Sequence, residues 1–590
     1  MKIVLANTVG IDSEGWRIIP YPSRWTTASL GHDDAFTYYP RDLAYLSSLL
    51  KRDTAHDVKL LDGCLERWNK EAYADRICEE RPDWLVIEDS TRTFEDDAWI
   101  AKAVRERTGA RIAFAGQHAT AFPDEAAAAA DLVVQGEYLK SLRDYFRDGP
   151  DARRLIPLAA GDLIDVANLP LPEDADVSRY AYALKADPIC EYREIQIYTS
   201  RGCPYRCVYC VARHAYFGAP TWRPRAAESV VAEIAALAAK YPEVEGFFFD
   251  DELHNADVEH VKRLCRAIVG AKLDGYRYQA MCAYAPFDLE ALELMKAAGY
   301  YKVRVGIETG SDVAADGLDL RGKYRPDKLD GFLENARRIG IKVYGTFTVG
   351  GRGATEAEDR KTVALMARLI GDDLLSDCQV SICTPQPGAP FYAWAEREGL
   401  LRHVDWRRFD GGDAAVLSLP GYPAERITAM RAEALAAYDT ARRRRDRAVF
   451  ERNWKVSAAA IAPRPRRVLL FRSVRNWVLE FLLQGIAGSW GARAGLLTND
   501  AGMRAPATDG AGVEMFVIPG SGFLRAEDVG DDTLNRMRAF GADLVLVPTA
   551  GERLQGYANI VEIATRVAGD APIRQLTGSG RLLPIEHRRD

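Results

Sequence analysis

The sequence predicts an α/β protein built from three successive α/β segments. Apolar strand-like runs alternate with segments of helical periodicity along most of the 590 residues. With 48% hydrophobic and 28% charged residues, the composition is that of a folded globular protein. At roughly 100–200 residues per domain, a chain of this length should contain about three or four domains.

The amino-terminal segment alternates predicted strands with helices at 41–52, 70–80 and 96–109. This order predicts a doubly wound, Rossmann-like sheet, which binds its ligand at the carboxyl ends of the strands near the topological switch point. No G-x-G-x-x-G follows the first strand, which disfavours a dinucleotide. The strands are expected at 2–7, 57–63, 83–90, 110–116 and 131–137. The candidate ligand-binding residues at their ends are Asp62, Ser90, Thr91, Arg92, Gly116, Gln117, His118, Gly136 and Glu137.

The middle segment alternates six predicted strands with helices. Such alternation implies parallel pairing through crossovers, and therefore an open or closed α/β barrel whose site lies at the carboxyl ends of its strands. Those ends are polar, because the second strand ends in Asp250, Asp251 and Glu252, the fourth ends in Glu308, and the fifth ends in Gly350. The six strands are expected at 194–200, 245–251, 276–282, 302–308, 340–350 and 377–383.

Three cysteines stand together just after the first of these strands. Cys203, Cys207 and Cys210 lie in TSRGCPYRCVYC, where a glycine and a proline force a loop. Their spacing allows the three sulfurs to converge on a soft metal centre. With His214 as a fourth ligand, the site would be a structural zinc site. An iron–sulfur cluster held by three cysteines would instead leave one iron open for an exchangeable ligand, and this interpretation is favoured.

With Tyr209 before the last cysteine, the motif closely resembles that of the radical S-adenosylmethionine (SAM) superfamily. The resemblance implies a partial TIM barrel, a [4Fe–4S] cluster on the three cysteines, and SAM that is chelated by the open iron and cleaved to a 5′-deoxyadenosyl radical. It also implies that Glu308 and Asp250 contact the amino or ribose groups of SAM, with the backbone around Tyr209 and from Phe347 to Gly350 near the adenine. The second strand ends in Phe-Asp-Asp, where the family has Gly-Gly-Glu.

The stretches GQHATAFPDE and DLVVQGEYLKSL resemble the cobalamin-binding domain that precedes the barrel in one radical SAM class. This resemblance covers about residues 1–415 and implies that the polar strand ends of the first sheet bind cobalamin. His118 could face the corrin or simply cap a loop, and the structural role is favoured for a lone histidine. Mutases and methionine synthase carry Asp-x-His-x-x-Gly, whose histidine ligates cobalt, whereas LLDGCLERWN has Cys64 and Leu65 there. Either cobalamin binds without a histidine lower ligand, as in many members of this class, or the domain is a vestige.

The last third contains a long predicted helix at 423–451, whose ARRRRDR run is expected to be a solvated face. Beyond Pro463 and Pro465, strand-like and helical runs predict a further small α/β domain without a recognised motif. RSVRNW (472–477) and GYANIVEIA (556–564) could line a substrate pocket or simply pack. The predicted division is a Rossmann-like cobalamin-binding domain at 1–150, a linker at 151–190, the radical SAM barrel at 191–420, a helical connector at 421–462 and the carboxyl-terminal domain at 463–590.

The resemblance implies a cobalamin-dependent radical SAM enzyme that methylates an unactivated carbon of a small-molecule or lipid-like biosynthetic intermediate. Asp251, Glu252 and His254 are candidates for substrate contact or proton transfer. Two alternatives remain open. One is a cyclase or rearrangement enzyme resembling the anaerobic cyclase of bacteriochlorophyll synthesis, and the other is a non-catalytic iron–sulfur or zinc protein.

The charge pattern bears on partners and location. A formal net charge of −7 supplies no field that would attract nucleic acid, so none is expected as a partner. No apolar run approaches the roughly 18–20 residues of a membrane span, and the first residues do not resemble a signal peptide, so a cytoplasmic protein is expected. The resemblance also implies a low-potential electron donor of the flavodoxin or ferredoxin type.

Overall fold

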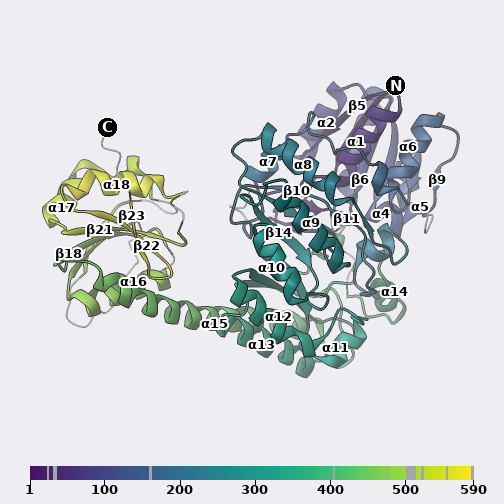
Figure 1. Ribbon diagram of the computed structural model, residues 1–590. Coiled ribbons are helices and arrows are strands. Elements are labelled where there is room, and N and C mark those ends of the chain that lie inside the picture. The colour runs from purple at the N-terminus through teal and green to yellow at the C-terminus, as the bar shows by residue number, and fades with distance from the viewer. Residues whose placement is uncertain are drawn as a thin grey trace. The chain divides into compact units, whose positions relative to one another are not determined.

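The computed structural model comprises two compact units, Met1–Ala437 and Tyr438–Asp590 (Figure 1). The structure describes residues 1–22, 26–30, 36–158, 163–402, 405–474, 476–499, 513–519, 524–552, 554 and 556–585. Residues 159–162 of the predicted linker and Arg475 of the RSVRNW stretch therefore lie outside the described residues.

The first sheet confirms the predicted doubly wound fold. Its six strands are all parallel, and their order is β5-β1-β6-β7-β8-β9. The chain order reverses between β1 and β6, which marks the topological switch point. The strands are β1 (Lys2–Asn7), β5 (Asp57–Leu61), β6 (Trp84–Asp89), β7 (Arg111–Gly116), β8 (Leu132–Val134) and β9 (Leu155–Ile156), and the last was not expected.

Helices cover both faces of this sheet, because its strands are apolar on both sides. On one face, Ile3 and Leu5 pack with α1 (Arg41–Asp53) and α6 (Tyr138–Asp148). On the other face, Val4 and Ala6 pack with α2 (Lys70–Glu79), α3 (Phe94–Thr108) and α5 (Pro123–Ala129). The sheet is therefore buried throughout, and only its strand ends are free to carry polar chemistry.

A small antiparallel sheet was not predicted. It consists of β2 (Gly10–Ile11), β3 (Arg17–Tyr21) and β4 (Thr26–Ser29), in the long connection between β1 and α1. Tyr21 and Thr27 from this sheet line a small cavity together with Thr8, Glu88 and Ser90 from the ends of β1 and β6. The small sheet thus covers the carboxyl ends of those two strands.

The second sheet confirms the predicted barrel topology. Six parallel strands follow one another in chain order, from β10 at one edge to β17 at the other. They are β10 (Glu194–Ile197), β13 (Gly246–Phe249), β14 (Arg277–Cys282), β15 (Tyr300–Glu308), β16 (Lys342–Val349) and β17 (Asp377–Ile382). The intervening helices are α8 (Ala227–Lys240), α9 (Val258–Gly270), α10 (Leu289–Ala297), α11 (Asp312–Gly317), α12 (Pro326–Ile339) and α13 (Glu356–Gly371).

The inner side of this sheet is filled near the strand beginnings and more open near their ends. Arg304 of β15 is buried, with Nη1 2.9 Å from Asp187 Oδ2, and the hydroxyl of Tyr38 donates to the same carboxylate oxygen over 2.8 Å. Further along β16, Thr346 and Thr348 are only half-buried. The partly exposed side chains thus lie toward the carboxyl ends, where barrels of this kind carry their sites.

The second unit contains a third α/β sheet. Helix α15 (Ala424–Ala459) contributes residues to both units, and Arg442, Arg445 and Arg447 of its basic run pair with nearby acidic or tyrosine side chains. The sheet order is β20-β19-β18-β21-β22-β23, parallel except for β23. The strands are β18 (Arg467–Phe471), β19 (Arg493–Thr498), β20 (Val513–Val517), β21 (Leu544–Thr549), β22 (Ile573–Thr577) and β23 (Leu582–Pro584), with helices α16 (Asn476–Trp490), α17 (Asp531–Phe540) and α18 (Ala558–Ala568).

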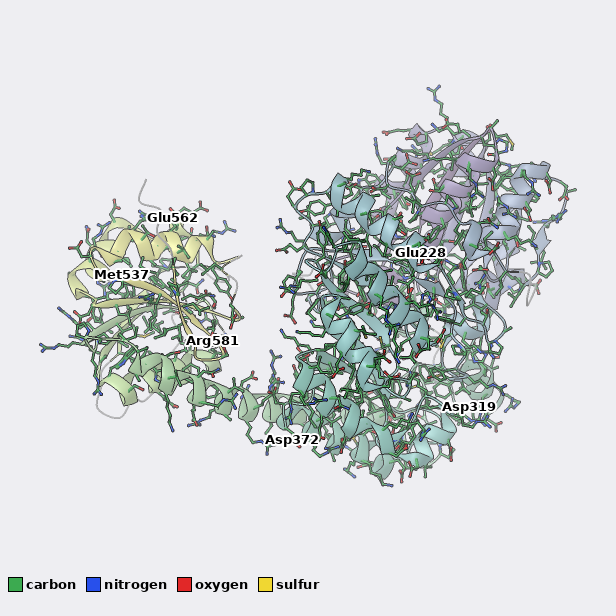
Figure 2. The ribbon with its side chains drawn as sticks, viewed as in Figure 1. Glu228, Asp319, Asp372, Met537, Glu562 and Arg581 are labelled. Atoms are coloured by element: carbon green, nitrogen blue, oxygen red, sulfur yellow. The ribbon has the colours of Figure 1, made fainter. Side chains whose placement is uncertain are left out.

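Side chains fill the space between helices and sheet within each unit (Figure 2). None of the described helices combines the length and the apolar character that crossing a bilayer requires. The five-part division of the chain stays a prediction, because the structure separates two units only.

Candidate active site

The three cysteines lie in the loop that follows β10. Strand β11 (Ser200–Arg201) pairs with β12 (Arg223–Pro224), and the loop projects between these two short strands. Gly202 has a φ of +98°, and a Cβ there would come within 2.4 Å of Thr221 O, so only glycine fits this turn. The amide of Cys210 donates to Cys207 O over 3.1 Å, which keeps the two cysteines on one tight turn.

The three thiols share one environment. All three cysteines are free; Cys207 is buried, and Cys203 and Cys210 are half-buried. Burial, followed by the neighbouring Cys210, raises the pKa of Cys203 to about 12. Burial likewise raises the pKa of Cys207 to about 11, against the lowering effect of Lys323. Three mutually interacting thiols beside a half-buried cation fit an iron–sulfur cluster, in which separate irons take one thiolate each.

His214, the candidate fourth zinc ligand, has its ring directed at the main chain. Its Nε2 lies 3.2 Å from Cys207 O. Among the residues that the structure describes, no three His, Cys, Asp or Glu side chains form a group that could hold a single metal ion.

An ion pair between a half-buried lysine and a buried glutamate lies beside the cysteine loop at the end of β15. Glu308 adopts a φ of +67°, and the register of β15 with β16 shifts between Gly306 and Glu308. Its Oε1 is 2.5 Å from Lys323 Nζ. Burial alone would lower the pKa of Lys323, but Glu308 and the thiols of Cys207 and Cys203 raise it above its usual value. Strained backbone of this kind is characteristic of functional sites.

The other residues predicted to lie near SAM are Tyr209, Phe347 and Gly350, and each has a different environment. Tyr209 is half-buried, and burial followed by the Glu308 carboxylate raises its pKa. Phe347 is 1% exposed and faces the covered side of β16, so only its backbone lies at the strand end. The amide of Gly350 donates to Asp359 Oδ2 over 2.8 Å, and the Gly350 φ is +72°. The less covered side of this sheet near the ends of β16 and β17 presents Thr346, Thr348 and Ser381.

The acidic end of β13 is bonded to β10 and its following residues. Asp250 accepts a hydrogen bond from Gln196 Nε2 over 2.9 Å. Asp251 accepts the amides of Thr199 and Ser200 over 2.7 and 3.1 Å, and its Oδ2 is 3.0 Å from His254 Nδ1. Burial opposes ionisation of Asp251, yet the bonds from His254 and Thr199 hold its pKa below the usual value.

His254 is fully buried, and its Nε2 lies 3.0 Å from the hydroxyl of Tyr300. Both ring nitrogens are therefore engaged by protein groups. Glu252 accepts the amide of Gly202 over 2.7 Å, directly before Cys203. The three residues predicted to contact substrate thus have partners that fix the strand end and the cysteine loop, and a substrate role for Asp251, Glu252 and His254 stays a prediction.

The loop that follows β6 carries two hydroxyl groups without a hydrogen-bond partner in the described part of the chain. They are Ser90 Oγ and Thr91 Oγ1, and both are buried. Unsatisfied buried hydroxyls are unfavourable unless a ligand completes them. Cobalamin bears many amide groups, so these two hydroxyls fit its presence at this edge of the sheet.

Gly116 and His118 lie beside Asp89, the residue that precedes Ser90. Gly116 has a φ of +156°, and a Cβ there would lie 2.2 Å from Asp89 O. Burial raises the pKa of Asp89 to about 7, although the amides of Ala119 and His118 donate to it. His118 is fully buried, stacks on Phe94 at 3.7 Å between ring centroids, and burial lowers its pKa to about 3. Its Nε2 is 3.5 Å from Glu125 Oε2.

Several residues of the first sheet that were predicted to bind cobalamin contact residues of the predicted barrel segment. Gln117 Nε2 donates to Gln386 Oε1 over 3.2 Å, in the TPQPG stretch (384–388) that follows β17. Arg92 donates to Arg407 O and to Ser29 Oγ. Glu137, which follows Gly136 at φ +73°, pairs with Arg201 beside the cysteine loop over 2.8 Å. Asp62 is the exception, because it accepts the hydroxyl of Tyr182 over 2.5 Å and the amide of Cys64.

Sequence reasoning missed three functional candidates. Lys323 follows α11 in a turn whose local sequence, RGKY, carries no motif. Arg41 and Asp42 open α1, where they look like ordinary residues of a helix terminus. Their burial, 1% and 0% exposed, is a property of the folded chain that no local pattern predicts.

Two family models match this chain. Residues 197–366 match the radical SAM superfamily. Residues 30–143 match the B12 binding domain.

Individual proteins resemble a larger part of the chain. An uncharacterized methyltransferase of Pyrococcus horikoshii is 27% identical over 418 residues, which cover 68% of this chain and 87% of that protein. The hopanoid C-2 methylase of Rhodopseudomonas palustris is 23% identical over 43% of this chain and 46% of its own length. Among solved structures, the radical SAM methyltransferase TsrM of Kitasatospora setae, with cobalamin and a [4Fe–4S] cluster bound, matches with a TM-score of 0.51 and 20% identity, covering 68% of this chain and 79% of that one.

Proposed function

Because this chain belongs to the cobalamin-binding radical SAM methyltransferases, we propose that it methylates an unactivated carbon of a small-molecule or lipid-like biosynthetic intermediate. Its cofactors are a [4Fe–4S] cluster, SAM and cobalamin. When bound, the cluster with SAM supplies a hydrogen-abstracting radical, and cobalamin supplies the methyl group.

One observation carries this proposal. The cysteine loop lies directly against the strand ends of the first sheet, where Arg201 Nε is 2.8 Å from Glu137 Oε1. Methyl transfer to an unactivated carbon requires hydrogen abstraction and methyl delivery at one substrate atom, so both cofactors must meet at one place. Sites for reactive ligands commonly lie at such domain junctions.

The side chains at the end of β15 are suited to hold SAM. Cys203, Cys207 and Cys210 supply three cluster ligands and leave one iron position for SAM. Lys323 supplies a half-buried positive charge that matches the SAM carboxylate, and Glu308 is an acceptor for the amino or ribose groups of SAM. In this arrangement the protein binds and orients SAM, since Lys323 and Glu308 are already paired with each other.

The substrate is proposed to enter over the more open side of β16 and β17. Thr346, Thr348 and Ser381 offer hydroxyl groups there without a charged side chain among them. A hydroxyl-lined surface suits a neutral or weakly polar molecule, and the hopanoid methylase among the relatives supports a lipid-like substrate. A flavodoxin- or ferredoxin-like donor would deliver the low-potential electron, and a cytoplasmic location remains part of the proposal.

The test is an anaerobic reconstitution with iron, sulfide and cobalamin, followed by SAM carrying a labelled methyl group, a reductant and extracted lipid or small-molecule fractions. Formation of 5′-deoxyadenosine, S-adenosylhomocysteine and a labelled product supports the proposal. Cys203→Ala should abolish all three products, whereas Cys378→Ala, a half-buried cysteine outside the loop, should retain them.

Two results would overturn the proposal. Deoxyadenosine formed without S-adenosylhomocysteine would move the chemistry to cyclisation or rearrangement. A protein that binds no iron and forms neither product would remove the radical reaction altogether.

A further inference from the structure

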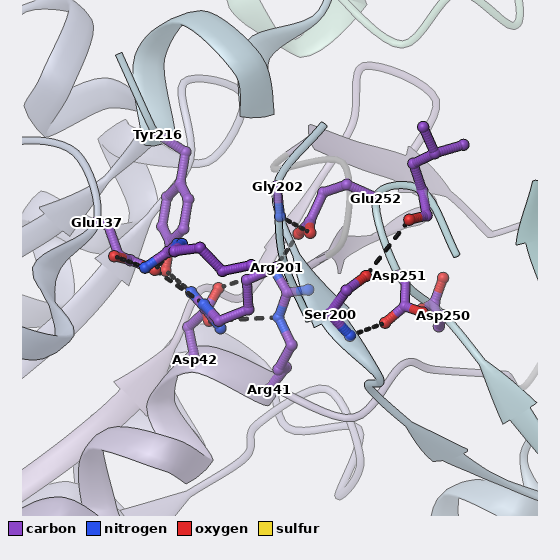
Figure 3. A network of polar contacts seen from close by, with 12 residues as sticks. Arg41, Asp42, Glu137, Ser200, Arg201, Gly202, Tyr216, Asp250, Asp251 and Glu252 are labelled. Carbon is purple, nitrogen blue, oxygen red and sulfur yellow. Dashed lines mark hydrogen bonds and ion pairs between the residues drawn. The ribbon is translucent and has the colours of Figure 1, made fainter. Parts of the chain in front are cut away.

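A buried network of charges joins the first sheet to both sides of the cysteine loop (Figure 3). Arg201, two residues before Cys203, lies 2.7 Å from Asp42 and 2.8 Å from Glu137. Its Nη2 donates to the hydroxyl of Tyr216, six residues after Cys210, over 2.7 Å. The loop is therefore closed on itself through Arg201 and attached to the ends of α1 and α6 by the same side chain.

A second connection acts on the residue between Arg201 and Cys203. Glu252, at the end of β13, accepts the amide of Gly202 through Oε2 over 2.7 Å. Its Oε1 is 2.6 Å from Arg41 Nη2 at the start of α1. The position of Gly202 thus depends on a carboxylate that a residue of the first domain holds in place.

The charges in this network balance. Asp42, Glu137 and Glu252 carry three negative charges, and Arg41, Arg201 and Arg223 carry three positive ones; Arg223 Nη2 lies 2.8 Å from Glu137 Oε1. Burial opposes ionisation of Asp42, but Arg201 and Arg41 hold its pKa below the usual value. Five of the six side chains are no more than 3% exposed, so water screens them little.

Buried ion pairs of this kind rarely stabilise a fold more than apolar packing would. Their best-attested use is to fix one specific arrangement of the groups that they join. Here the arrangement is specific, because the carboxylates point at the Gly202 amide and at the Arg201 guanidinium, which belong to the two residues directly before Cys203. An apolar junction could hold the two domains together, but it could not fix one peptide unit of the loop.

We propose that Asp42 and Arg41 of the cobalamin-binding domain are positioning residues that fix the cluster loop through Arg201 and Glu252. The distance between the cluster and the cobalamin face is then set by this network rather than by the loop alone. The inference rests on the proposed function in taking Cys203 as a cluster ligand. The loop attachment itself is a property of the protein without cofactors.

The test compares the wild type with variants of the network, each as the cofactor-free full chain. Mass spectrometry measures the rate of hydrogen exchange in the peptide that spans Ser200 to Tyr205. Asp42→Asn and Glu252→Ala should accelerate exchange in this peptide at least tenfold. Glu252→Gln keeps an acceptor for Gly202 and should retain most of the protection. The matched control is Glu233→Gln, a carboxylate that is equally buried between Arg179 and Arg225 but has no bond to the loop.

A second readout uses the reconstituted cluster. The electron paramagnetic resonance spectrum of the reduced cluster, recorded with and without SAM, should change in Asp42→Asn and match the wild type in Glu233→Gln. If Asp42→Asn does not fold, Arg41→Lys is the substitute. This variant retains the positive charge but loses Nη2, the nitrogen that contacts Glu252. Its loop peptide should also exchange faster than that of the wild type, by a smaller factor.

Unchanged loop exchange in folded Asp42→Asn and Glu252→Ala would overturn the inference. Equal acceleration in Glu233→Gln would do so as well, because the effect would then be general loosening. Since exchange is measured without iron, SAM or cobalamin, this result is independent of whether the reconstituted protein transfers a methyl group.

Discussion

Lys323 Nζ lies 2.5 Å from Glu308 Oε1, in a position only partly open to solvent beside the thiol of Cys207. The two charged groups lie at the end of β15, where the backbone of Glu308 adopts the left-handed region. The pair places one positive and one negative group next to the proposed cluster, which is the charge pattern that the zwitterionic end of SAM would meet.

We expect Lys323→Met to weaken SAM binding at least about tenfold, because it removes a half-buried cation and leaves the Glu308 carboxylate uncompensated. Iron content should not change, since the three thiols remain. Equilibrium dialysis of the reconstituted protein with SAM measures the effect. Lys328→Met is the control, as that lysine donates to Ala285 O outside the pair. Equal SAM affinity in the wild type and Lys323→Met would contradict the assignment.

Gly306→Ala should disrupt the same pair by steric means. A Cβ at Gly306 would lie 2.2 Å from Glu308 Oε1 and 2.6 Å from Lys323 Nζ, so the side chains would have to move. The expected result is a lower melting temperature together with weaker SAM binding. Gly331→Ala, in α12, meets nothing within 4 Å and should instead stabilise the protein by about 0.5–1 kcal/mol. Thermal unfolding of both variants checks the contrast.

The double variant Ser90→Ala/Thr91→Val should have opposite effects on stability and on cobalamin binding. Removing two buried hydroxyls without partners should stabilise the cofactor-free protein by about 1 kcal/mol or more. The same change should weaken cobalamin binding, measured by the visible absorbance retained after gel filtration. Thr93→Val is the matched control, because Thr93 Oγ1 bonds to Asp97 over 3.0 Å and its loss should destabilise. If cobalamin binding stayed at the wild-type level, the two hydroxyls would not be contacts.

Asp89 should make the cofactor-free protein lose stability as pH rises. Burial raises its folded pKa to about 7, above the ordinary value of 3.8, so the folded chain binds more protons than the unfolded chain between these values. This contribution is fully present below pH 3.8 and is lost as pH rises through 7, at up to about 1.4 kcal/mol per pH unit. Denaturant unfolding of the wild type and Asp89→Asn at several pH values isolates it. A difference between the two proteins that does not vary with pH would refute the assignment.

Much of the scaffold could be predicted because it depends on local periodicity. The alternation of apolar runs gave the parallel order of both sheets in the first unit, and the cysteine spacing gave the loop after β10. The strands β2 to β4 escaped prediction, because two to five residues are too few to show a period. The partners of Arg201 and Lys323 also escaped, since Asp42 is 159 residues away from Arg201 and no sequence pattern encodes such a pairing.

The charge network at the domain junction has a consequence for handling the protein. Surface ion pairs weaken as salt shortens the reach of electrostatic forces, but ions do not enter a site where the side chains of Arg41, Asp42, Arg201 and Glu137 are at most 2% exposed. The junction between the cobalamin-binding domain and the barrel should therefore persist at ionic strengths that dissolve surface contacts. A high-salt purification step should leave these two domains attached to one another.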